Sequence, residues 1–116
     1  MQALVLRRKF SKFLFAILSS IVTTASFSTE NEALLVISKH RFEPAELKIP
    51  ANQRVRLTIH NTDSTAEEFE SHALNREKLI PAGKKVVIFI GPLKAGTYAF
   101  VGEYNEASAK GVVIAE

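Results

Sequence analysis

The chain has no cysteine among its 116 residues, and its single methionine is Met1. It therefore forms no disulfide, and no thiolate can serve as a metal ligand or a nucleophile. We also find no serine-nucleophile motif and no glycine-rich phosphate loop. Any metal chemistry must therefore use oxygen ligands, chiefly carboxylates, with histidine as the remaining nitrogen ligand.

Acidic residues are absent from the start of the chain, where four basic residues fall within the first 12 positions. An apolar run from Phe13 to Val22 follows, and small residues surround Ala25 and Ser28. This pattern is typical of a secretory signal peptide. The run is short for a membrane anchor, which needs roughly 20 apolar residues. We expect residues 1–28 to be a signal peptide that is cleaved after Ala25 or Ser28.

Removal of this leader reverses the sign of the net charge. The full chain has 15 basic and 12 acidic side chains, and the four basic residues of the leader leave 11 against 12, a net charge of −1. No basic patch remains, so we expect no nucleic-acid partner. A short basic leader points to a bacterial periplasmic protein whose mature form does not span the membrane.

The mature region reads as short strands separated by turns. Val55, Leu57 and Ile59 alternate with polar residues, as in a half-buried strand. Val86 to Ile90 is apolar on both faces and predicts an interior strand. Ala73 to Lys78 suggests a helical turn or an irregular loop. About seven strands with little helix predict an all-β sandwich over residues 33–116.

Several motifs narrow this choice of sandwich. Glu68-Phe69-Glu70 is followed by Arg76-Glu77, and Gly96-x-Tyr98 precedes a closing Lys110-Gly111. With Phe42-Glu43-Pro44 and the turn at Pro50, these motifs resemble the EfeO-type cupredoxin-like domain family of bacterial iron-uptake systems. The resemblance implies a cupredoxin-like Greek-key sandwich.

The resemblance also shows what is missing. In cupredoxins, Cys, His and Met ligands lie on one loop, and here Gly102, Asn105 and Ala109 take their positions. A blue-copper site requires a thiolate, so the resemblance implies a metal site without one.

Acidic residues are the candidate ligands. Glu68 and Glu70 lie two apart in an extended segment, so they share a face while Phe69 points into the core. The resemblance places them near the ligand loop that carries Glu103 and Glu106. These four carboxylates could share a hard cation, although solvated surface acids are the common alternative.

Histidines offer a second ligand set. His72 would lie on the face of Glu70 if the strand continues, and we include it among the candidate ligands. His40 adjoins a strand end and is a weaker candidate, while His60 is expected to face solvent. Glu77 is expected to form a structural ion pair with Arg76, or else to orient a ligand.

The resemblance implies a periplasmic protein that binds iron or copper and assists ferrous iron uptake, at most as an accessory of iron oxidation. The metal ion is its first partner, and a membrane iron permease or another periplasmic uptake component would be the second. Two alternatives remain open. The domain could be a metal-free protein-interaction module of a transport system, or it could bind Cu(II) through His40 or His72.

Overall fold

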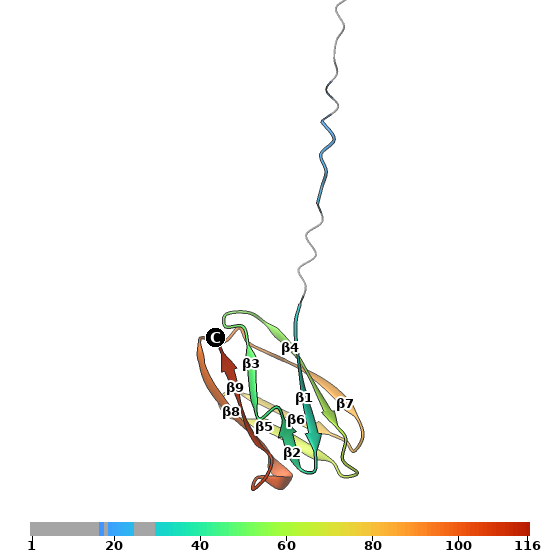
Figure 1. Cartoon of the computed structure of the whole chain (residues 1–116), viewed down its shortest axis with the longest axis vertical. Coiled ribbons are helices and arrows are strands. Elements are labelled where there is room, and N and C mark those ends of the chain that lie inside the picture. Colours follow the sequence, from blue (N-terminus) through green and yellow to red (C-terminus); the bar gives the residue numbers. More distant parts are fainter. Residues whose placement is uncertain (1–16, 18, 25–29) are drawn as a thin grey trace, which may run out of the picture.

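A computed structural model describes residue 17, residues 19–24 and residues 30–116. The predicted signal peptide and its cleavage site lie largely outside these residues and remain a prediction. From Asn31 onward the chain forms a β-sandwich (Figure 1). The strands are β1 (Asn31–Ser38), β2 (Arg41–Glu43), β3 (Glu46–Ile49), β4 (Val55–Asn61), β5 (Glu67–Ser71), β6 (Arg76–Ile80), β7 (Lys85–Ile90), β8 (Gly96–Gly102) and β9 (Lys110–Ala115), with a 3-10 turn η1 (Glu103–Asn105) before β9.

Two sheets form the layers of the sandwich. One has the order β2-β1-β4-β7 and the other the order β3-β9-β8-β5-β6. The neighbours β1 and β4 run parallel, as do β3 and β9, whereas the remaining pairs are antiparallel. The turn η1 lies at the end of the sandwich opposite the C-terminus (Figure 1). No helix in the described part of the chain is long and apolar enough to cross a membrane.

The core follows from the period-2 alternation seen in the sequence. In β4, Val55, Leu57 and Ile59 are buried, and the side chains between them are partly exposed. Aromatic rings join the strands near η1: the Phe42 ring packs edge-on against Phe100 at 5.0 Å and against Phe69 at 6.1 Å between centroids. This edge-on aromatic packing stabilises the core of the sandwich beneath η1.

The all-β sandwich is confirmed, with nine strands instead of about seven. Lys39 and His40 adopt positive φ angles and turn the chain between β1 and β2, which makes two strands of this segment. The stretch from Ala73 to Lys78 was predicted wrongly in part, since β6 begins within it at Arg76. A turn ending at Asn75, whose φ is 51°, makes β5 and β6 a hairpin.

The prediction of an interior strand at Val86–Ile90 is wrong, because β7 is an edge strand of its sheet. Its outward side chains are only partly covered. The exposed ring of Phe89 lies under the Arg54 guanidinium, 4.0 Å from the ring centroid. A cation over an aromatic face accounts for an apolar side chain at this position.

Candidate metal centre

Strand β5 sorts its carboxylates onto two faces. Glu67, Phe69 and Ser71 are buried, whereas Glu68 and Glu70 are partly exposed on the opposite face. The shared face predicted for Glu68 and Glu70 is therefore present. Phe69 is fully buried, as predicted.

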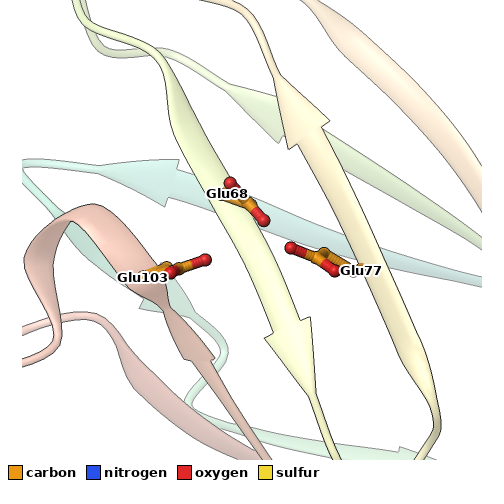
Figure 2. A group of neighbouring side chains, drawn as sticks. All are labelled: Glu68, Glu77 and Glu103. Carbon is orange, nitrogen blue, oxygen red and sulfur yellow. The ribbon is translucent and has the colours of Figure 1, made fainter.

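Three elements bring carboxylates together at the surface. Glu68 lies on β5, Glu77 on the adjacent β6, and Glu103 on η1, and the latter two side chains point toward Glu68 (Figure 2). One carboxylate oxygen from each lies within 4.8 Å of the others. Oxygens that bind one Ca²⁺ at roughly 2.3–2.6 Å lie at most about 5 Å apart, so this spacing suits a shared cation. We call Glu68, Glu77 and Glu103 the acidic triad.

The three carboxylates of the acidic triad perturb one another. A hydrogen bond with the Glu77 carboxyl lowers the pKa of Glu68. The same hydrogen bond raises the pKa of Glu77, and the negative charge of Glu68 raises the pKa of Glu103. A hydrogen bond to Glu68 also raises the pKa of the Tyr104 hydroxyl. The triad therefore retains a proton more readily than isolated carboxylates, and a bound cation would relieve the repulsion between them.

The other predicted ligands lie beside the triad. Glu70 is directly opposite Glu77 in the β5–β6 register, and its Oε1 lies 3.4 Å from Nε2 of His72. Glu70, His72 and Glu106 line a shallow, largely apolar depression of about 340 Å³ over β5 and β8. The structure thus brings Glu68 and Glu103 together and places Glu70, His72 and Glu106 around a neighbouring hollow.

The weaker histidine candidates lie elsewhere. Nδ1 of His40 is 3.6 Å from the Asp63 carboxylate, which also accepts the backbone N–H groups of Lys39 and His40. His60 faces outward on the other sheet and lines a separate hollow with Lys85, in agreement with its predicted exposure. Within the described residues, no histidine belongs to a group of three ligands that could hold a metal.

Glu77 joins the triad through β6, a strand that the sequence pattern did not predict. The predicted ion pair with Arg76 is wrong: the Arg76 guanidinium donates instead to the Phe89 and Asn75 carbonyl oxygens, each at 2.9 Å. Glu77 and Arg76 are neighbours in an extended strand, so their side chains point to opposite faces. The useful signal was Asn75, a residue that favours the positive φ of a hairpin turn.

A second missed residue is Glu67, which is only 2% exposed. Its Oε1 accepts hydrogen bonds from the backbone N–H groups of Glu68 and Tyr104, both at 2.9 Å. Its Oε2 accepts a hydrogen bond from the side-chain Nδ2 of Asn105 at 2.7 Å. Every buried side-chain nitrogen or oxygen in the described residues has a hydrogen-bond partner. The Glu67 carboxylate is therefore fully satisfied by protein donors.

Two of the three positions that lack copper ligands, Gly102 and Asn105, lie beside Glu67, and the third, Ala109, lies beside Gly102. Asn105 donates to Glu67, and a Cβ atom added to Gly102 would lie 2.7 Å from Glu67 Cδ and 2.7 Å from Ala109 Cβ. The space where a thiolate would enter is thus already filled. A blue-copper ion does not fit this arrangement, which lacks both the ligands and the room.

Comparison with known proteins agrees with this architecture. A model of the cupredoxin-like domain matches residues 11–115. This chain belongs to the cupredoxin-like domain family. It is also 40% identical over 83 residues to an uncharacterized protein of Rickettsia prowazekii (strain Madrid E), a match covering 72% of this chain. The chain spans 66% of that relative, slightly under two thirds of its length.

Solved cupredoxins share the fold at low sequence identity. Auracyanin A, a blue copper protein of Chloroflexus aurantiacus, matches with a TM-score of 0.62 and 14% identity, covering 76% of this chain and 100% of that one. The metal-binding domain of the Streptococcus pneumoniae Cu(I)-exporting ATPase CopA, solved with Cu(I), matches with a TM-score of 0.62 and 17% identity, covering 73% of this chain and 84% of that one. This cupredoxin-like protein thus shares the fold of copper-binding proteins and lacks the cysteine of a blue-copper site.

Proposed function

We propose that this cupredoxin-like protein binds an iron ion at the acidic triad and assists ferrous iron uptake in the bacterial periplasm. The observation that carries the proposal is the convergence of Glu68, Glu77 and Glu103 from three separate elements to within 4.8 Å. Carboxylates alone suit Mg²⁺, Ca²⁺ or Mn²⁺. Iron is preferred because the motifs resemble the EfeO-type family.

The proposed role is to hold iron as cargo for a membrane permease or another periplasmic uptake component. Three carboxylates would stabilise Fe(III) over Fe(II), because negative ligands favour the higher charge. Oxidation releases one electron, and the cysteine-free chain has no blue-copper site to accept it. We therefore propose at most an accessory part in oxidation, with a separate protein or dioxygen as the electron acceptor.

Calorimetric titration of the metal-stripped mature protein tests this proposal. Fe(II) under anaerobic conditions, Mn(II) and Cu(II) are titrated in parallel at pH 7. We expect one Fe(II) or Mn(II) per chain, and we expect Glu68→Gln to weaken binding more than Glu106→Gln, its matched control outside the triad. Absence of Fe(II) and Mn(II) binding to the wild type would refute the proposal.

A metal-free interaction module is the second candidate function, and one observation favours it. Leu79 and Tyr104, which are 50% and 54% exposed, flank Glu68 on the triad face. Tyrosine is enriched among the residues that carry the binding energy of protein interfaces. If no cation binds, we expect Tyr104→Ala and Leu79→Asp to reduce retention of the protein on the membranes of its own cells. Glu106→Gln is the control.

A further inference from the structure

We propose that Glu67 is the positioning residue of the acidic triad. Its carboxylate occupies the place where this fold otherwise gathers copper ligands, and it holds Glu68 and Glu103 at the spacing of a shared cation. This inference rests on the proposed function, since it concerns how the same metal centre is assembled.

One oxygen atom of Glu67 links the two backbones that carry the triad. Its Oε1 accepts the N–H of Glu68 in β5 and the N–H of Tyr104 in η1, both at 2.9 Å. Glu103 is the residue before Tyr104 in the same turn. A shift of the carboxylate would therefore change the separation between Glu68 and Glu103.

The Glu67 carboxylate also attaches the turn η1 to the sandwich. None of its three residues is buried, and no side chain caps its start. Oε2 of Glu67 accepts Nδ2 of Asn105, the last residue of the turn, at 2.7 Å. Other hydrogen bonds of this segment join Gly102 and Asn105 to Ala109, or join Ser108 to the His40 carbonyl. Glu67 is thus a buried link from η1 to β5, beside the exposed hydrogen bond between Glu68 and the Tyr104 hydroxyl.

The Glu67 carboxylate that joins β5 to η1 is buried. Glu67 is 2% exposed and lies against Gly102, which leaves room for it because glycine has no side chain. Buried groups that orient metal ligands typically change metal affinity about 10- to 100-fold when they are removed. Glu67 fits this role without contacting the cation itself.

The test compares two replacements of Glu67 by calorimetric titration with Mn(II), and with Fe(II) under anaerobic conditions. Glu67→Ala removes all three hydrogen bonds, and we expect its affinity to fall about 10-fold or more. Glu67→Gln keeps one oxygen for both N–H groups, and Asn105 can rotate its amide to accept from the new Nε2. We expect this conservative variant to retain affinity within about threefold of the wild type, well inside the loss expected for removal.

A control separates positioning from loss of stability. Leu35→Ala removes a fully buried side chain from β1 in the other sheet, so it destabilises the fold without touching the triad and should leave affinity unchanged. If Glu67→Ala does not fold, Asn105→Ala removes only the Oε2 contact and is expected to weaken binding less than tenfold but measurably. Amide chemical shifts of Glu68 and Tyr104 report the link directly, and Glu67→Gln should move them less than Glu67→Ala.

The outcomes distinguish failure of the metal centre from failure of the role of Glu67. If the wild type binds neither Mn(II) nor Fe(II), both the metal centre and the role of Glu67 are refuted. If the wild type binds and Glu68→Gln does not, but Glu67→Ala binds as tightly as the wild type, only the positioning role is overturned. Equal losses in Glu67→Ala and Leu35→Ala would also overturn it, because stability alone would then explain the effect.

Discussion

Glu67 and Glu68 are adjacent in β5 and lie in opposite electrostatic environments. Glu67 points inward, is 2% exposed, and accepts three hydrogen bonds from the protein. Glu68 points outward beside Glu77 and Glu103. Its hydrogen bond raises the pKa of Glu77, and its negative charge raises the pKa of Glu103. One carboxylate is satisfied by the protein alone, whereas the other stands among like charges.

The difference shows how a cupredoxin-like fold without the copper ligands can hold one carboxylate on protein donors and gather others at its surface. The charge of the buried Glu67 carboxylate is balanced by its three hydrogen-bond donors, without a cation. The surface position carries repulsion that a cation would remove. The two-residue period of a strand is enough to place these opposite environments on neighbouring residues.

The largest expected effect comes from removing each carboxylate in turn. Glu67→Ala leaves three donors without their charged acceptor, so we expect a loss of about 3 kcal/mol or more in the free energy of unfolding. Glu68→Ala leaves no buried donor unpaired, so it should lower the stability at pH 7 far less than Glu67→Ala. Urea unfolding of both variants measures this contrast, and equal losses would refute the distinction between the two sites.

Filling the space beside Glu67 should have the next largest effect. Gly102 has a φ of −92°, which alanine tolerates, but its Cβ would lie 2.7 Å from Glu67 Cδ and 2.7 Å from Ala109 Cβ. We expect Gly102→Ala to cost about 1–3 kcal/mol by overpacking.

Gly96→Ala is the matched control, because its Cβ would meet only ordinary contacts, the nearest at 3.7 Å. The cost at Gly102 should shrink in a Glu67→Asp background, where the carboxylate is withdrawn. An equal cost in both backgrounds would show that Glu67 is not the obstacle.

Neutralising Glu77 should change the stability less than the substitutions above, and it should raise the stability instead of lowering it. The pKa of Glu77 is raised by its hydrogen bond with Glu68, so the folded protein holds more protons than the unfolded chain. Stability should then fall as the pH rises from the ordinary carboxyl pKa through the raised one. Glu77→Gln removes this loss, and its melting temperature should exceed that of the wild type at pH 7.

Melting curves from pH 4 to 8 in metal-free buffer measure this effect. Glu68 works in the opposite direction, because its lowered pKa adds stability that is lost as the pH falls through the lowered value. Saturating Mn(II) should abolish the advantage of Glu77→Gln at pH 7. A variant that melts below the wild type at pH 7 without metal would contradict the assignment of repulsion.

The smallest expected effect concerns His72. Its side chain is 96% exposed and contacts Glu70, outside the acidic triad. His72→Ala should change the affinity for Mn(II) by less than about twofold, since a ligand or its orienting group costs about 10-fold or more. A larger loss, measured by calorimetry beside Glu106→Gln, would move the metal centre toward the neighbouring hollow.

The sequence was a good guide to the sandwich and to the faces of β5, because strict alternation determines which side chains point inward. The sequence did not predict β6. Four of its five residues are exposed, so the segment lacks the alternation of apolar and polar residues that predicts a strand. Glu77 was therefore assigned to an ion pair. Glu67 was missed because its partners, Tyr104 and Asn105, are far along the chain, and only the fold brings them near.

The most direct test of the central claim is nuclear magnetic resonance of the ¹⁵N-labelled protein during addition of substoichiometric Mn(II). Paramagnetic broadening should be strongest for the amides of Glu68, Glu77 and Glu103, and Glu68→Gln should reduce it. Broadening centred on His40 and Asp63, or broadening that no triad substitution alters, would contradict a cation site at the acidic triad.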